Sequence, residues 1–338
     1  MRGLILRRRL EAMGARVAFL TRDLPWGAQK LRACGSRVLA ATSDTDAQAM
    51  LAVLRKALET TSPQVCVMDV LETDDAQTRL MREMGARVVC LDDVGPGRLN
   101  ANAIVNVLEV EPARALLAEQ GIALYEGPAY AALPEDYAAP GIANREVPTR
   151  VRRVVVTLGG ADPAGLAPKA MHALRQALES RVAAAAFDDP RALVLIGAAS
   201  DRCEEVELAV RGAETSFSIK ESVPSLLPLL RDADLGIVAG GLTMHEALAV
   251  GLPCIALCQP VRHQAELAQR FADAGVMINL GPGAALTAGQ IAEAILSLAA
   301  DLNLRRRIAA GGPQLVDGQG GQRTANIICG VAATASSQ

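Results

Sequence analysis

Short apolar runs rich in Val, Ile, Leu and Ala alternate with stretches of helical periodicity along almost the whole chain. Such runs fit strands that are buried on both faces, and the stretches between them fit helices that cover those faces. The alternation predicts an α/β fold built from βα units around parallel sheets. With 338 residues, 29 of them Gly, and only 2% aromatic residues, the chain is long enough for two such domains, each with its own core.

The strands are predicted from these runs. In the first half they are Arg16–Leu20, Arg37–Ala40, Val65–Asp69, Arg87–Leu91 and Ile104–Leu108. In the second half they are Val154–Leu158, Leu193–Ile196, Ser216–Ile219, Leu235–Ala239, Cys254–Leu257 and Val276–Leu280. Helices are expected between them, for example over Asp46–Leu58 and Asp75–Met84.

The alternation lapses between Gly121 and Pro148, where prolines and all three tyrosines interrupt any regular pattern. We interpret this stretch as a linker. It divides the chain into two predicted Rossmann-like domains, residues 1–148 and residues 149–338.

The first residues follow a helical pattern: Leu6, Leu10 and Met13 recur at helical spacing before Gly14. No strand and no capping residue precede this helix. We therefore expect that the sequence begins inside a βαβ unit and that the first strand of domain 1 is missing.

The charge of the chain constrains its partners. A formal net charge of −3 gives no electrostatic basis for binding nucleic acid, whereas a small anionic ligand is compatible with it. Arg2 and the run Arg7–Arg9 hint at contact with acidic lipids, although such a run on a helix is more often a solvated face. The sequence does not predict an oligomeric state.

Cysteine usage and hydropathy indicate the compartment. The seven cysteines are scattered, form no C-x-x-C pair and fit small buried side chains in a reducing cytoplasm. No apolar run approaches the length that spans a bilayer. We expect a cytoplasmic protein without a membrane span.

The strongest candidate site lies within Asp234–Pro253, where a buried strand passes through Gly240-Gly241 into a short helix. Such a turn presents backbone amides and a positive helix end to an anion at the carboxyl edge of a sheet, which fits a pyrophosphate. Leu242 and Thr243 continue the turn, and Glu246 is placed to accept both hydroxyls of a ribose. The alternative is local: Thr243-x-x-Glu246 has the spacing of a capping box.

A second loop, Thr157–Pro163, ends the first strand of the second domain. Gly159 and Gly160 allow close approach of the backbone to a ligand in the same crevice. Asp162-Pro163 also fits an ordinary helix start, which is the favoured interpretation for Asp162.

Candidate catalytic groups are few. Among the three histidines we favour His263, at the head of a helix, over His245, and we expect His172 to be a surface residue. Asp92 and Asp93 follow a strand directly, and one of them is expected to face the cleft between the domains. No zinc-ligand spacing, phosphate-binding P-loop or nucleophile elbow occurs, so neither a metal nor a cofactor is expected.

The stretch from Gly240 to Pro253, followed by His263-Gln264, resembles the donor-binding half of GT-B glycosyltransferases of family 28, typified by the enzyme that makes lipid II. Further segments occur in the order seen in the UDP-sugar hydrolases of pseudaminic acid synthesis, which act on UDP-2,4-diacetamido-2,4,6-trideoxy-β-L-altropyranose, and in their spore-coat polysaccharide relatives. These segments are Met1-Arg2 through Thr21-Arg22-Asp23, Leu91-Asp92-Asp93, Gly127-Pro128-Ala129-Tyr130, Gly159-Gly160-Ala161-Asp162 and Asp317–Arg323.

The resemblance implies a two-domain GT-B enzyme that binds a UDP-sugar in its cleft and cleaves the bond between the anomeric carbon and the phosphate, with water as acceptor and no metal. Gly240, Gly241, Leu242, Thr243 and Glu246 would hold the nucleotide, with Gln264 near the sugar. The family's expected general base is a histidine in a Gly-x-Gly-His-x-Met-Arg loop, and this sequence starts at the Met-Arg. If the protein starts upstream, that histidine is the expected base; if it does not, Asp69, Asp92, Asp93 or His263 would have to substitute for it.

Two other functions remain open. One is a glycosyltransferase that uses the same donor site with a sugar or lipid acceptor. The other is a non-catalytic nucleotide-sugar-binding protein.

Overall fold

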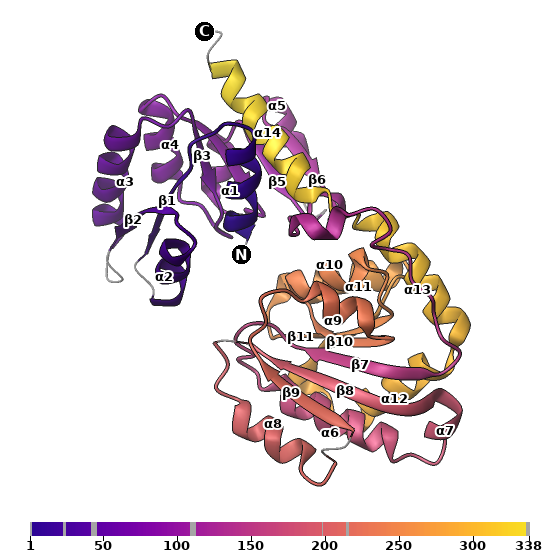
Figure 1. Ribbon diagram of the computed structural model, residues 1–338. Coiled ribbons are helices and arrows are strands. Elements are labelled where there is room, and N and C mark those ends of the chain that lie inside the picture. Colours follow the sequence, from indigo (N-terminus) through magenta and orange to yellow (C-terminus); the bar gives the residue numbers. More distant parts are fainter. Residues whose placement is uncertain are drawn as a thin grey trace. The chain divides into compact units, whose positions relative to one another are not determined.

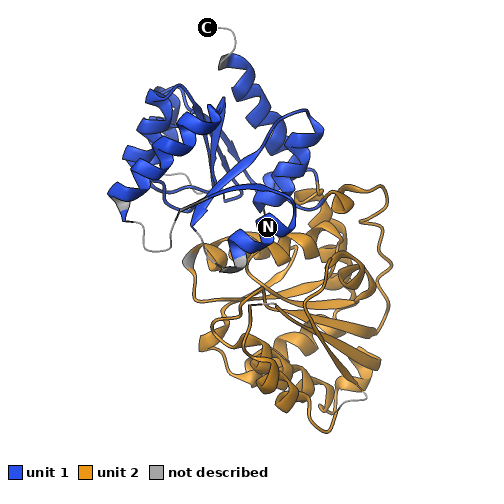
Figure 2. Cartoon of the chain, turned by 60° about the vertical axis from the view of Figure 1, so that its left-hand side comes forward, with its two compact units in different colours: residues 1–134, 319–338 blue, residues 135–318 orange. Residues whose placement is uncertain are grey.

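The computed structural model describes residues 2–22, 25–41, 46–108, 113–197, 199–213 and 216–335. Met1 and Asp23, which belong to segments that carry the resemblance, lie outside these residues. The chain forms two compact units: unit 1 comprises Met1–Pro134 and Gln319–Gln338, and unit 2 comprises Glu135–Gly318 (Figure 2).

The strands of unit 1 are all parallel and form two groups. One is the pair β1 (Ala18–Arg22) and β2 (Arg37–Ala41). The other is a four-stranded sheet in the order β3-β4-β5-β6, with bounds Val65–Met68, Arg87–Leu91, Ala103–Asn106 and Ala123–Glu126. The four-stranded sheet brings the carboxyl ends of β3 and β4 together at one edge.

Helices cover both faces of the four-stranded sheet (Figure 1). Val88 and Cys90 point to one face, where they pack with residues of α3 (Ala47–Thr61), α4 (Asp75–Glu83) and α5 (Arg114–Glu119). Val89 and Leu91 point to the other, against α1 (Arg2–Ala12) and α14 (Gly320–Ala335). This alternation is the period of two expected of a strand buried on both faces. The remaining helical segments of the unit are α2 (Pro25–Ala33), η1 (Pro96–Asn100) and η2 (Pro128–Tyr130).

The basic cluster of the first helix is used inside unit 1. The guanidinium of Arg7 donates to Glu11 at 2.8 Å, to the Cys34 carbonyl at 2.8 Å and to the Ser36 hydroxyl at 2.7 Å. Arg9 donates to Gln322 at 3.3 Å. These contacts engage Arg7 and Arg9 within the unit, whereas Arg8 is exposed.

Unit 2 is built on a six-stranded parallel sheet in the order β12-β11-β10-β7-β8-β9. The strands are Ile278–Pro282, Cys254–Cys258, Leu235–Ala239, Val151–Thr157, Phe187–Ile196 and Phe217–Glu221. The chain adds strands on one side of β7 and then crosses to the other side with β10. The carboxyl ends of β7 and β10 therefore form a topological switch point, the place where open α/β sheets bind ligands.

The unit 2 sheet is likewise covered on both faces (Figure 1). One layer contains α6 (Leu166–Leu178), α7 (Ala183–Ala186), α8 (Cys203–Val210) and α12 (Ala288–Ala300), which share one apolar core with the sheet. The opposite layer contains α9 (Leu227–Asp232), α10 (Leu242–Ala249) and α11 (Arg262–Asp273). The unit also includes η3 (Glu135–Ala138), η4 (Gly283–Ala285) and α13 (Leu302–Leu315).

The predicted α/β class, the parallel sheets and the opening helix are confirmed, and every predicted strand is present within a few residues of its predicted bounds, except that β8 begins earlier. The proposed linker needs correction because it contains β6, which pairs with β5 and belongs to the unit 1 sheet.

The observed division also differs from the predicted boundary at 148/149. It falls after Pro134, and residues 319–338 return to unit 1 because α14 packs on its sheet. Two arginines hold residues 135–150 to unit 2. Arg145 donates to the backbone carbonyls of Leu230, Ala233 and Val250, and Arg305 donates to those of Pro148 and Thr149.

Candidate nucleotide-binding site

Two Gly-Gly turns lie together at the switch point of unit 2. Gly159-Gly160 follows β7, Gly240-Gly241 follows β10, and these strands are neighbours in the sheet. A Cβ atom built on Gly159 would lie 3.9 Å from the Cβ of Ala239, the last residue of β10. The structure thus brings both predicted loops to one edge of the sheet.

The helix after the second turn starts without a side-chain cap. Gly241 is the N-cap of α10, and no side chain hydrogen-bonds there. Thr243 lies inside the helix, so the capping-box interpretation of Thr243-x-x-Glu246 is wrong. The chain enters the helix through two glycines, which leaves the first amides and the positive helix end available to an anion.

Close packing explains why residue 240 is a glycine. A Cβ at this position would lie 2.7 Å from the Sγ of Cys258 and 3.0 Å from the Cβ of Gln264. The turn is therefore seated against the end of β11 and the first turn of α11. Gln264 lies next to the Gly-Gly turn, and its Oε1 is buried without a hydrogen-bond partner among the described residues.

Glu246 lies one turn into α10 and is 8% exposed. Burial raises the pKa of its carboxyl to about 7, and the hydroxyl of Tyr137 partly offsets that shift. A buried carboxylate with few partners is suited to accept hydrogen bonds from a ligand. Tyr137 was not anticipated as a site residue, because it stands in the irregular stretch that carries all three tyrosines.

Asp162 has a structural role, but it is not the N-cap that the sequence favoured, because α6 begins at Leu166 with Gly165 as its N-cap. Its carboxylate accepts hydrogen bonds from the amides of Leu166 and Ala167 at the start of α6, at 2.9 and 2.8 Å. It also accepts one from the side-chain amide of Gln259, the residue after β11, at 2.8 Å. The network fixes the loop after β7 against the loop after β11.

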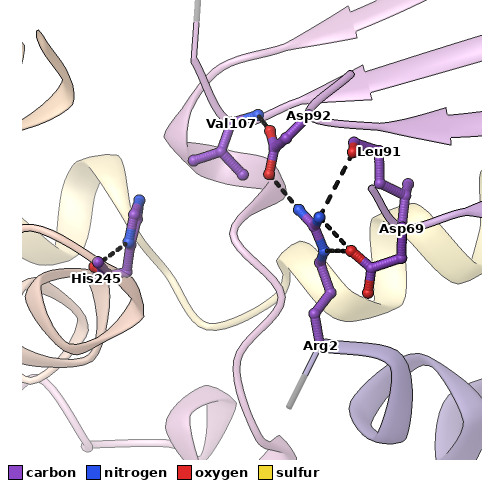
Figure 3. Close-up of polar contacts among 7 residues, drawn as sticks. Arg2, Asp69, Leu91, Asp92, Val107 and His245 are labelled. Carbon is purple, nitrogen blue, oxygen red and sulfur yellow. Dashed lines mark hydrogen bonds and ion pairs between the residues drawn. The ribbon is translucent and has the colours of Figure 1, made fainter. Parts of the chain in front are cut away.

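The three histidines occupy different environments. His245 is buried in α10, where its ring meets that of Phe271 edge-on and its Nδ1 lies 3.3 Å from the carbonyl oxygen of Gly241 (Figure 3). His263 is half-buried in the first turn of α11, one residue before Gln264. His172 is exposed on α6, as predicted.

In unit 1, Arg2 joins two aspartates that follow neighbouring strands. Its guanidinium forms ion pairs with Asp69, after β3, and with Asp92, after β4 (Figure 3). Asp92 has a left-handed backbone with φ of 50°, and its Oδ1 accepts a hydrogen bond of 2.6 Å from the amide of Val107. Asp is among the non-glycine residues that adopt this left-handed conformation most readily.

Asp93, the other candidate of the pair, points into the protein. It is fully buried and accepts hydrogen bonds from the Thr73 amide and hydroxyl and from the Gly95 amide. These contacts fix the loop after β3, and they leave Asp93 without access to a substrate. We therefore retain Asp92, and not Asp93, as a catalytic candidate.

These features define a class. The chain has the GT-B fold, in which each of two units is built on a parallel sheet with helices on both faces. It is also a homologue of the spore coat polysaccharide biosynthesis protein SpsG of Bacillus subtilis, with 27% identity over 251 residues that cover 74% of this chain and 71% of that protein. No model of a protein family matches the chain.

The chain is also similar to other known proteins. An uncharacterized protein of Methanocaldococcus jannaschii, MJ1062, is 22% identical, and the match covers 72% of this chain and 49% of that protein. Among solved structures, MurG of Acinetobacter baumannii has a TM-score of 0.72 at 14% identity, over 97% of this chain and 94% of MurG. A structure of MnaA of S. aureus with UDP has a TM-score of 0.62 at 12% identity, over 97% of this chain and 92% of MnaA. At such identities the structural matches establish the fold.

No helix among the described residues is both long and apolar enough to cross a membrane.

Proposed function

We propose that this chain is a UDP-sugar hydrolase-like enzyme that releases UDP from a UDP-amino sugar during the synthesis of a surface polysaccharide or nonulosonic acid. The observation that carries the proposal is the pair of Gly-Gly turns at the switch point of unit 2, where α10 begins without a side-chain cap. Support for the pathway comes from the similarity to a protein named for polysaccharide biosynthesis.

In this proposal, unit 2 binds the nucleotide. The diphosphate lies on the amides of Gly241, Leu242 and Thr243, with Gly159 and Gly160 close to it. A helix N-terminus stabilises the negative charge that develops on the leaving UDP. Glu246 accepts the ribose hydroxyls.

The sugar lies near Gln264, whose buried oxygen lacks a partner among the described residues. His263 stands next to it at the start of α11. A buried amide oxygen without a partner costs free energy, and a sugar hydroxyl that donates to it would remove that cost.

The reaction breaks one bond and forms another. A water oxygen attacks the anomeric carbon, the bond from that carbon to the phosphate oxygen breaks, and its electron pair leaves with UDP. The proton of the water passes to a base. We assign this role to Asp92, whose position Arg2 and the Val107 amide hold from two sides.

A glycosyltransferase is the second candidate, in which a sugar or lipid hydroxyl replaces water. It is favoured by the names of the structural neighbours. They include the calicheamicin glycosyltransferase CalG4, with a TM-score of 0.63, and the glycosyltransferase VinC in complex with dTDP, also with a TM-score of 0.63.

The test is release of UDP from a panel of UDP-amino sugars, with and without candidate acceptors. Release with water alone that is lost in Glu246→Ala and kept in Glu293→Ala, a change on the exposed face of α12, supports the hydrolase. Release that requires an acceptor supports the transferase. UDP binding without turnover under either condition identifies a binding protein.

A further inference from the structure

Cys258, the last residue of β11, is fully buried and packs against the Gly240-Gly241 turn. A Cβ built on Gly240 would lie 2.7 Å from the Sγ of Cys258, which is closer than a real Cβ approaches another atom. The sulfur therefore fills the space that a side chain at position 240 would need, and the turn rests directly on this thiol. A larger or smaller side chain at position 258 would change the position of the turn.

The thiol also contacts the first turn of α11 and the neighbouring strand β12. Its Sγ lies 3.6 Å from the carbonyl oxygen of Gln264 and 3.8 Å from the Oδ1 of Asn279, so the S–H can donate to either oxygen. Gln264 is the residue proposed to lie near the sugar, and the Gly240-Gly241 turn is proposed to bind the diphosphate. One side chain thus contacts both of the elements that the proposed function assigns to the two halves of the substrate.

Gln259, the next residue, holds the loop after β7. Its Nε2 donates to the Oδ1 of Asp162 at 2.8 Å, and its Oε1 accepts a hydrogen bond of 3.1 Å from the amide of Ala164. Gln259 is 5% exposed, so these bonds are shielded from water, where a hydrogen bond is stronger. The same loop carries the Gly159-Gly160 turn. The end of β11 therefore holds both glycine turns.

We propose that Cys258 and Gln259 are positioning residues for the diphosphate of the nucleotide. Cys258 sets the position of the Gly240-Gly241 turn, and Gln259 sets that of the Gly159-Gly160 turn. The inference rests on the proposed function, because both turns belong to the proposed nucleotide site. Backbone amides bind an anion well only when their N–H groups converge on it, so a small shift of either turn weakens binding. Neither side chain needs to touch the ligand.

The test is calorimetric titration of the full chain with UDP, based on an exchange of size between positions 240 and 258. Gly240→Ala places a methyl group where the thiol lies and should weaken UDP binding at least about tenfold. Cys258→Ala should weaken binding about threefold in the wild-type chain, because the turn loses its support. Added to Gly240→Ala, the same change makes room for the methyl group and should strengthen binding about threefold. A residue that affects only the stability of the chain would not show this reversal in UDP affinity.

Two further variants show whether the effect is specific. Cys254→Ala removes an equally buried thiol from the first residue of β11. It should lower the urea midpoint of unfolding about as much as Cys258→Ala, with UDP affinity unchanged. Gln259→Met keeps a side chain of similar size without the two hydrogen bonds, and it should weaken UDP binding about threefold in both the wild-type and the Gly240→Ala chain.

Urea unfolding of every variant shows that it is folded under the conditions of the titration. If Cys258→Ala does not fold, Cys258→Ser makes the same comparison, because it shortens the side chain less and should change UDP affinity in the same directions by smaller factors.

The possible results separate this inference from the proposed function. Unchanged affinity in Cys258→Ala, or no gain when it is added to Gly240→Ala, overturns the role of Cys258. An equal loss of affinity in Cys254→Ala also overturns it, because the loss would then come from a general loosening of β11. Unchanged affinity in Gln259→Met overturns the role of Gln259. Failure of the wild type to bind UDP, or full binding by Gly240→Ala, overturns the proposed nucleotide site itself.

Discussion

The carboxylate of Asp162 accepts a hydrogen bond of 2.8 Å from the side-chain amide of Gln259, and this buried pair connects the loop after β7 with the loop after β11. Asp162 also has a left-handed backbone, with φ of 43°. Because the Gly159-Gly160 turn ends two residues before it, the order of this turn depends on Asp162. The proposed phosphate site thus relies on a residue that does not need to touch the phosphate.

We predict that Asp162→Ala lowers the free energy of unfolding by about 3 kcal/mol, because it leaves two amides of α6 and the Gln259 side chain without their acceptor. Urea unfolding followed by circular dichroism measures the change. Asp201→Ala, at an exposed carboxylate, is the matched control and should stay within about 0.5 kcal/mol of the wild type. Equal stability of the two variants would contradict the prediction.

A second prediction concerns Gly240→Ala. The added Cβ would meet Cys258 and Gln264 at distances that require the turn to move, which displaces the amides of α10. We expect UDP affinity to fall at least about tenfold, a loss of about 1.4 kcal/mol. Gly330→Ala, in α14 with nothing within 4 Å of the new atom, should keep full affinity. Calorimetry with UDP checks both, and unchanged affinity in Gly240→Ala would show that the turn does not bind the nucleotide.

The third prediction compares neighbouring aspartates. Asp92→Asn removes the proposed base and should lower the rate of UDP release about 100-fold, with UDP affinity unchanged because the proposed nucleotide site lies in unit 2. Asp93→Asn disturbs the buried bonds to Thr73 and Gly95 and should instead lower the melting temperature, with a smaller effect on the rate. Steady-state kinetics and thermal unfolding distinguish the two variants. A large loss of rate in Asp93→Asn with little effect in Asp92→Asn would assign the base to Asp93.

Most strands could be predicted from the sequence, and one could not. The bounds of β4 and β10 match the prediction because both are apolar runs buried on two faces, a pattern set by local composition. The strand β6 was missed because Ala123–Glu126 is short and weakly apolar, and its pairing with β5 makes it a strand. Tertiary contacts decide such segments.

The candidate site, like the fold, could be predicted only in part. The Gly-Gly turns were found because glycine pairs at strand ends are a local signal. The sequence could not separate Asp92 from Asp93, because the two carboxylates differ in partners from distant parts of the chain: Arg2 for Asp92 and Thr73 for Asp93. It also could not reveal Tyr137 or the partners of Arg2, since these contacts join residues far apart in the chain.

The last prediction is a dependence of stability on pH that arises from Glu246. Burial raises its pKa in the folded chain to about 7, above its ordinary value of 4.5 in the unfolded chain. Below about pH 4 the Glu246 carboxyl is mostly protonated in both the folded and the unfolded state, so its ionisation does not change the free energy of unfolding. As pH rises from 4.5 to 7 the unfolded state ionises first, so wild-type stability falls, and above pH 7 the penalty is constant.

Glu246→Gln removes this ionisation, so the variant should be more stable than the wild type by up to ~3 kcal/mol at pH 8, with the difference vanishing near pH 4. Urea unfolding of both proteins across this range measures it, and Glu293→Gln, on an exposed face, should show no such pH-dependent gain. Glu246→Gln should nevertheless bind UDP more weakly than the wild type at pH 8, because the ionised carboxylate is the form proposed to accept the ribose hydroxyls. If Glu246→Gln is more stable and binds UDP as tightly as the wild type, Glu246 is only a buried acid. If the variant is more stable and binds UDP more weakly, Glu246 is a binding residue that lowers the stability of the folded chain.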